Sequence, residues 1–292
     1  MESIGKALSF ICIAVIVVVV FSIFYFVAVR GLSTFVGPDS VGVSAFLFGT
    51  NWNPSTVGPD GERLAGALPM FMGSLIVTFL SAIVATPFAI GAALFMTEIS
   101  PNRGAKILQP AIELLVGIPS VVYGFIGLSI IVPFIRNIFG GTGFGILAGT
   151  FVLFVMILPT VTSMTTDAIK AVPRHYREAS LGLGATRWQT TYKVVLRAAI
   201  PGILTSIVFG MARAFGEALA IQMVVGNSPV MPTSLVTPAS TLTSILTMGI
   251  GNTIMGTFEN NVLWSLALLL LLMSLVFNVI IRIIGKRGEM KE

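Results

Sequence analysis

The chain has 292 residues, of which 55% are hydrophobic and only 10% are charged, and its mean hydropathy is +0.97. These values exclude an ordinary soluble protein and indicate an integral membrane protein. The net charge of +5 does not indicate nucleic-acid binding, because the basic residues stand at the ends of apolar runs and form no single patch.

The sequence offers no grouping of residues suited to metal or nucleotide chemistry. Cys12 is the single cysteine and lies inside an apolar run, which excludes a disulfide framework or a cysteine metal site. His175 is the single histidine, and no GxxxxGK[ST] phosphate-binding loop occurs. We therefore expect no catalytic residue, no metal and no cofactor on this chain. If ATP drives the protein, another chain must bind it.

Apolar runs of about 20 residues, the length needed to cross a membrane, recur along the chain. Charge-free runs of this kind occupy 7–29, 67–97, 114–135, 143–166 and 260–281. A sixth run, 198–226, qualifies apart from Arg213 and Glu217. The sequence therefore predicts an all-α integral membrane protein with six transmembrane helices. The first run is too long for a cleaved signal peptide, so residues 1–30 are expected to form a retained anchor helix.

The positions of Lys and Arg predict the orientation. If the N-terminus is cytoplasmic, thirteen of the 17 basic residues fall on the cytoplasmic side and three on the external side. This bias is typical of a membrane protein with both termini in the cytoplasm. It predicts an external loop at 31–66, a membrane core at 67–285 with a cytoplasmic loop at 167–197, and a cytoplasmic tail at 286–292.

The segment from Gly117 to Gly124 is unusually rich in residues that break helices. It contains two glycines, Pro119, Ser120 and Tyr123 within one predicted span. Such a segment survives in lipid only where protein or a water-filled path satisfies the freed backbone groups. It therefore either lines a path, with Ser120 and Tyr123 as candidate path residues, or only bends a helix.

Arg213 and Glu217 are charged residues inside a predicted span. If the helix is continuous, they lie one turn apart on one face and can neutralise each other as a structural pair. Intramembrane charges usually serve function, however, and the planar fork of an arginine matches phosphate or another oxyanion. We favour a functional role, with Arg213 on the path of an anion.

The cytoplasmic loop carries the most informative motif. Glu178, Ala179 and Ser180 are followed by Gly184 and, after an apolar step, by Pro201. This pattern resembles the EAA-loop signature of ABC-importer permeases, in which Glu-Ala-Ala is followed after three residues by Gly. Ser180 departs from the pattern, because alanine is usual there.

Other segments resemble the PstC-type permease subunit of the phosphate-specific (Pst) importers. These segments are Trp52-Asn53-Pro54, Gly66–Pro69, Thr97–Pro101, Gly117–Gly124 and Arg213–Glu217. The resemblance covers nearly the whole chain, apart from the first helix and the last few residues. The choice of PstC over its sister subunit PstA depends mainly on the long first external loop.

The resemblance implies a type I ABC-importer permease fold in a prokaryotic cytoplasmic (inner) membrane. A short coupling helix carrying Glu178 and Ala179, and ended by Gly184, would seat in a cytoplasmic ATPase that binds ATP and Mg²⁺. The implied partners are a homologous PstA-like permease subunit, a dimer of ATP-binding subunits, an extracytoplasmic phosphate-binding protein and the surrounding membrane lipid. Arg213 would meet the anion, and Glu217 would balance its charge.

Three other interpretations remain open on sequence alone. The chain could be the permease of a sulfate- or molybdate-type ABC importer, which one arginine does not distinguish from a phosphate permease. An ion-coupled secondary anion transporter could also place charges in broken helices, but it would show internal repeats and would not need the loop motif. A non-transporting membrane scaffold would use Arg213 and Glu217 for structure alone.

Overall fold

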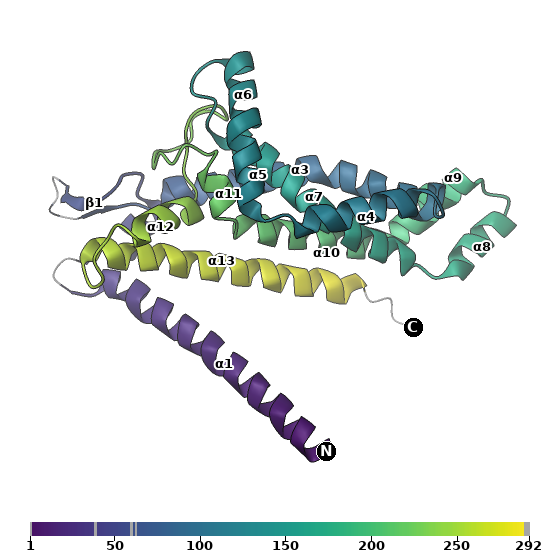
Figure 1. Ribbon diagram of the computed structural model, residues 1–292, viewed down its shortest axis with the longest axis horizontal. Coiled ribbons are helices and arrows are strands. Elements are labelled where there is room, and N and C mark those ends of the chain that lie inside the picture. Colours follow the sequence, from purple (N-terminus) through teal and green to yellow (C-terminus); the bar gives the residue numbers. More distant parts are fainter. Residues whose placement is uncertain (1, 38–39, 59–60, 62, 289–292) are drawn as a thin grey trace. The chain divides into compact units, whose positions relative to one another are not determined.

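The computed structural model describes residues 2–37, 40–58, 61 and 63–288. Within these residues six helical segments are long and apolar enough to cross a membrane, which confirms the predicted all-α class with six spans. They are Leu8–Phe35, Leu68–Ile99, Ser120–Phe139, Ile146–Lys170, Arg187–Phe215 and Phe258–Ile284. Figure 1 shows the elements in chain order.

The chain forms two compact units, and each is described by itself. One comprises Met1–Leu68 and Ile245–Leu271, and the other comprises Pro69–Ser244 and Leu272–Glu292. Of the predicted cytoplasmic tail, residues 286–288 belong to the last helix, and 289–292 lie outside the described residues.

The first unit contains the N-terminal helix and the predicted external loop. Its elements are α1 (Glu2–Leu32), η1 (Ser33–Phe35), α2 (Val43–Phe48), β1 (Trp52–Val57) and β2 (Arg63–Ala65), with parts of α12 (Leu242–Ile250) and α13 (Phe258–Gly288). The loop is not featureless, because β1 and β2 pair as an antiparallel hairpin with Trp52 opposite Ala65. The hydroxyl of Ser265 donates to the carbonyl of Gly31 over 2.7 Å, which ties the end of α1 to α13.

The second unit is built around α7 (Ile146–Lys170) and α10 (Leu196–Phe215). Small residues let these helices approach closely: a Cβ on Gly202 would come within 2.6 Å of Ala168, and one on Gly210 within 2.5 Å of Val161. The hydroxyls of Thr165 and Ser206 share a buried hydrogen bond of 2.8 Å between the two helices. Small residues and interhelical hydroxyl bonds are how helices associate in lipid, where apolar burial gives little driving force.

Besides this pair and parts of α12 and α13, the unit contains ten further elements. They are α3 (Leu68–Leu94), the π-helical η2 (Phe95–Ile99), α4 (Gly104–Gly117), α5 (Ser120–Ile126), η3 (Gly127–Ile131), α6 (Val132–Phe139), α8 (Arg174–Gly182), α9 (Arg187–Thr190), η4 (Thr191–Val195) and α11 (Leu219–Gln222). Near the loop that is predicted to be cytoplasmic, Ala93, Ile169 and Val195 of α3, α7 and η4 are fully buried in a common apolar cluster.

The third span begins later than predicted, at Ser120 instead of residue 114. Pro119 disfavours a helical conformation in the residue before it, and Ile118 is extended at φ −72° and ψ 127°. The apolar run 114–135 is therefore divided between α4 and α5, which run in clearly different directions in Figure 1. Pro119 caps the start of α5 and does not interrupt a helix.

The fifth span also differs, running from Arg187 to Phe215 where the sequence predicted 198–226. It starts earlier because Thr186 and Gln189 form a reciprocal capping box. Lys193 and Arg197 interrupt the apolar run, so the sequence prediction began the span only at residue 198. Long basic side chains are nevertheless tolerated near the ends of membrane helices, because they reach out to the interface. The helix ends at Phe215, and the rest of the predicted span, up to residue 226, forms only the short α11.

Candidate functional site

The short helix predicted around Glu178 is present as α8, a nine-residue helix that carries Glu178, Ala179 and Ser180, and its coupling role stays a prediction. Its end is a Schellman motif, in which Ala185 N donates to Ser180 O over 3.2 Å and Gly184 N donates to Leu181 O over 2.9 Å. Gly184 has a φ of +84°, which residues with a Cβ rarely adopt. The sequence prediction that Gly184 makes the turn after the helix is thus confirmed.

The outer face of α8 and its turn is open. Glu178 and Ala179 are exposed, and 90% of Leu183 is accessible to solvent. The hydroxyl of Ser180 shares a hydrogen bond of 2.9 Å with that of Thr190 in α9. Serine at this place in the motif therefore ties α8 to the start of the next span, a contact that alanine cannot make.

A second group of predicted residues lies where α10 ends. Arg213 stands in the last turn of α10, and its Nη1 donates a hydrogen bond to the hydroxyl of Thr160 in α7. Arg213 is half-buried, so part of its guanidinium stays accessible.

Tyr123 and Ser120 belong to α5, which packs closely against α11, the short helix that follows the end of α10. The Tyr123 hydroxyl donates to the carbonyl of Leu115 over 2.7 Å, which satisfies a backbone group in the last turn of α4. A Cβ on Gly124 would come within 2.9 Å of Ala220 Cα, so α5 lies directly against α11. Ser120 is the first residue of α5 and is half-buried.

The structural pairing of Arg213 with Glu217, the alternative that the sequence left open, is not found. These two described residues form no ion pair within 4 Å; Glu217 Oε1 instead accepts from Ala220 N over 3.1 Å. The prediction assumed a continuous helix, but α10 ends at Phe215, so residues four apart no longer lie on one helical face. The carboxylate of Glu217 stabilises the short α11 that follows the break.

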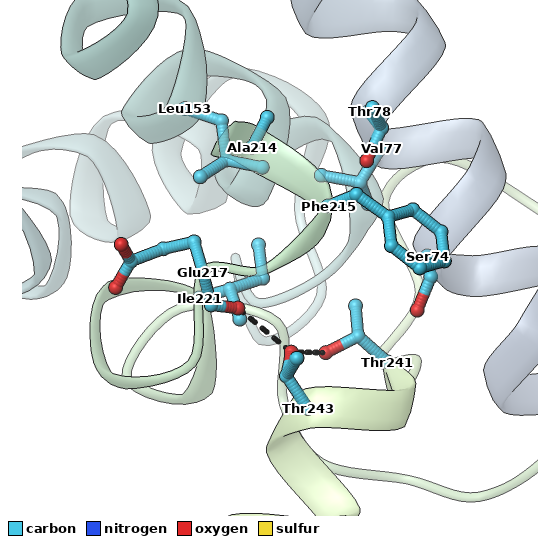
Figure 2. A pocket seen from close by; sticks show the side chains of 10 residues that line it. All are labelled: Ser74, Val77, Thr78, Leu153, Ala214, Phe215, Glu217, Ile221, Thr241 and Thr243. Carbon is cyan, nitrogen blue, oxygen red and sulfur yellow. Dashed lines mark hydrogen bonds between the residues drawn. The ribbon is translucent and has the colours of Figure 1, made fainter. Parts of the chain in front are cut away.

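Figure 2 shows a small cavity beside this break. Hydroxyls of Ser74, Thr78, Thr241 and Thr243 line it together with apolar side chains, and its volume is about 10 Å³. Thr243 donates to the carbonyl of Glu217 over 2.7 Å and shares a bond with Thr241, while the Glu217 carboxylate points away from both threonines (Figure 2). The cavity has room for about one water molecule, so it cannot hold an oxyanion.

Sequence reasoning missed three polar residues of this region: Thr160, Ser74 and Thr243. Each makes a hydrogen bond to a segment distant in the sequence. In a membrane sequence such hydroxyls carry no periodic signal, because Ser and Thr also bond to their own helix backbone. Only the position of Thr160, directly after Pro159, could have drawn attention to it.

The family described as "Binding-protein-dependent transport system inner membrane component" matches residues 85–289. The chain belongs to this family. Membership makes it the permease subunit of an ABC importer and a multi-pass protein of the inner membrane, and it implies a partner ATPase and a substrate-binding protein. Permease subunits of this kind are not themselves enzymes.

The permease has relatives over nearly its full length. It is 51% identical to the probable ABC transporter permease protein YqgH of Bacillus subtilis, over 98% of this chain and 91% of that one. It is 32% identical to the phosphate transport system permease protein PstC of Pasteurella multocida, over 85% and 81% of the two chains. The similarity to PstC-type permeases stated from the sequence motifs is therefore confirmed.

Solved structures confirm the fold. An inward-facing structure of the MetNI methionine ABC transporter matches with a TM-score of 0.53 at 24% identity, over 73% of this chain and 93% of that one. An amino acid ABC transporter crystallised with histidines matches with a TM-score of 0.54 at 20% identity, over 75% and 92%. The permease thus has the type I ABC-importer fold.

Proposed function

We propose that this permease is the PstC-type subunit of an ATP-driven importer of inorganic phosphate. The observation that carries the proposal is Arg213, which the hydroxyl of Thr160 holds at the end of α10. A guanidinium is a preferred group for binding phosphate, and an arginine that stays partly accessible within a bundle is suited to meet an anion in transit. The relatives named PstC support the same substrate.

The partners follow from this role. A PstA-like permease subunit completes the path, and two ATP-binding subunits supply ATP and Mg²⁺ sites, since this chain has no phosphate-binding loop of its own. An extracytoplasmic phosphate-binding protein delivers the substrate to the external side. The exposed Glu178, Ala179 and Leu183 form the surface on which an ATP-binding subunit docks, as the resemblance of this segment to the EAA loop implies.

The transport cycle then needs two states of the segment after α10. In the structure the cavity beside Glu217 is closed to anything larger than water. Movement of α8 with the ATPase opens this region to the substrate on one side at a time, as a rigid-body alternation. Glu217 holds α11 during that change, and Arg213 provides the positive charge on the path.

Uptake by intact cells tests the substrate. Cells lacking the gene for this permease should lose uptake of phosphate at low external concentration and keep uptake of sulfate and molybdate. The gene returned on a plasmid should restore phosphate uptake. Loss of sulfate or molybdate uptake with phosphate uptake unchanged would assign the other oxyanion, and no change in any of the three would refute the proposal.

A further inference from the structure

Arg177 ties α8 to two membrane helices. Its Nε and Nη2 both donate to Glu98 Oε1, over 3.2 and 2.8 Å, and its Nη1 donates to the carbonyl of Val172 over 2.7 Å. Nη2 also donates to the carbonyl of Ile169 over 3.1 Å. The guanidinium thus contacts both the end of the α3 span and the end of α7. Charge-assisted bonds of this forked kind fix direction as well as distance.

The pair is shielded from water and crosses an otherwise open recess. The side chains of Arg177 and Glu98 are only 22% and 14% exposed. An open recess of about 570 Å³ separates α8 from the end of the α3 span. Its walls are Met96, Thr97, Glu98, Pro101 and Ala105 on one side and Lys170, Arg174, Arg177 and Glu178 on the other. The ion pair therefore bridges two walls that are elsewhere apart.

The other attachments of α8 are of a different kind. No residue of α8 is buried, and Tyr176 is only half-buried where it packs against the apolar cluster that includes Ile169 and Val172. The hydroxyl of Ser180 shares a hydrogen bond with that of Thr190, so this contact connects α8 to α9 and not to α3. Apolar packing is non-directional and permits sliding, whereas the forked ion pair does not.

Glu98 lies in η2, the π-helical segment that closes the α3 span. The wider turn is marked by the bond from Ser100 N to Phe95 O, over 2.8 Å and five residues apart. Single π-helical turns occur frequently at functional sites. The position gives α3 a carboxylate at the end nearest to α8.

The far end of α3 contacts the segment 240–242, and the next residue, Thr243, donates to the carbonyl of Glu217 just after the break in the fifth span. The Ser74 hydroxyl accepts from Leu242 N over 2.9 Å, and a Cβ on Gly73 would lie 2.1 Å from the carbonyl oxygen of Ser240. Figure 2 shows Ser74, Val77 and Phe215 among the side chains that line the cavity. The helical path from Ser74 to Glu98 is about 36 Å long, at about 1.5 Å per residue.

We propose that Glu98 and Arg177 are positioning residues that carry the movement of α8 into α3, and that α3 carries it to the broken segment beside Arg213. The inference rests on the proposed function in one respect, that an ATPase moves α8. The ion pair is a directional contact across the recess, and α3 is the helical connection from that contact to the cavity beside Glu217. Hydrogen-bond and ion-pair networks together with helices are physical elements through which distant sites can be coupled.

Two neutral variants test the pair: Glu98→Gln, which keeps the size of the side chain, and Arg177→Gln, which shortens it. In proteoliposomes that hold the complete importer, each should lower the phosphate transported per ATP hydrolysed by about tenfold, as expected for the loss of one charge-assisted interaction. The amount of copurified ATPase should stay unchanged. Glu113→Gln is the matched control, because Glu113 is exposed and bonds to Gln109 on α4, away from α8.

A second measurement does not depend on the substrate. Nitroxide labels replace Phe88 on α3 and Ile200 on α10, both exposed, in a Cys12→Ser background. Their separation should change when ATP and vanadate are added, and this change should be lost in Glu98→Gln and Arg177→Gln. If the label separation behaves in this way but the wild-type importer moves no phosphate, the proposed substrate fails and the link stands.

Two results overturn the proposal. One is a normal ratio of phosphate to ATP, with a normal label movement, in both variants. The other is a loss of transport that only parallels a loss of protein or of bound ATPase, because that is the behaviour of a residue that merely holds the fold together.

Discussion

Arg213 shows how the fold accommodates a charge in an apolar protein. An arginine at the centre of a membrane helix costs at least about 2.5–3.5 kcal/mol on insertion scales. The predicted compensation by Glu217 is absent, since the two described side chains form no ion pair. Arg213 instead lies in the last turn of α10, where unpaired carbonyls favour a positive charge, and it donates to Thr160. A guanidinium held in this way keeps part of its surface accessible to an anion.

Replacing Arg213 by glutamine is expected to abolish phosphate uptake or reduce it strongly, with protein level and ATPase binding near normal. Arg213→Lys keeps the charge but loses the planar fork, so it should retain partial activity at most. Thr160→Val is the related control, since it removes the hydroxyl that orients the guanidinium while keeping the charge. Its phosphate uptake should lie between those of Arg213→Gln and Arg213→Lys. Wild-type uptake by Arg213→Gln would remove this residue from the path.

Glu217→Gln should behave differently from Arg213→Gln. The amide oxygen of glutamine can still accept from Ala220 N, so α11 keeps its bond and uptake should remain within a fewfold of the wild type. Had the two residues been an ion pair, this variant would have left an uncompensated arginine and been severely impaired. Phosphate uptake rates of the single and double variants, compared as a double-mutant cycle, test whether the two residues form an ion pair. Strong rescue of Arg213→Gln by Glu217→Gln would show that they do and would contradict the structure.

At the scale of elements, α8 was predicted through its resemblance to the EAA loop, and local signals agree with that prediction. Pro173 starts the helix, Gly184 supplies the positive φ that ends it, and both are visible as residue types. The bounds of the spans around α8 were harder to predict from the sequence. Counting apolar residues divided the chain at Arg197, although capping by Thr186 starts the helix at Arg187.

Gly184→Val tests the role of this turn. A β-branched residue at a φ of +84° is strained by about 1–2 kcal/mol or more, so the end of α8 should shift or fray. The permease should still insert but lose phosphate uptake, with weaker ATPase binding or ATP hydrolysis that no longer drives transport. Gly182→Ala is the control, because Gly182 is helical and a Cβ there meets open space. Equal uptake and ATPase binding by Gly184→Val and the wild type would show that the turn does not matter.

At the scale of the whole molecule, the number of spans followed from length and hydropathy, but the relations between spans did not. The break after Phe215 lies in a stretch that reads as one apolar run, and it depends on contacts with α3, α5 and α7 that lie far away in the sequence. The same reason explains why Arg213 could be recognised as a candidate while its partner, Thr160, could not. A hydroxyl bond between two helices has no sequence pattern of its own.

The orientation of the chain remains a prediction from the positions of Lys and Arg, and labelling tests it. In a Cys12→Ser background, cysteines at Ser55 and Val230 should react with an impermeant thiol reagent added to intact cells. Cysteines at Asn102 and Arg174 should react only after permeabilisation; all four positions are exposed. The reverse pattern would place α8 outside the cell and remove it from any cytoplasmic ATPase.

Reconstitution tests the central claim most directly. The permease is incorporated into proteoliposomes with its sister permease and two ATPase subunits, with the phosphate-binding protein on the external face and ATP on the cytoplasmic face. We predict accumulation of labelled phosphate that requires ATP hydrolysis, needs the binding protein, resists competition by excess sulfate and is lost with Arg213→Gln. Phosphate accumulation driven by an ion gradient without ATP, or none under any of these conditions while sulfate or molybdate is imported, would contradict the account.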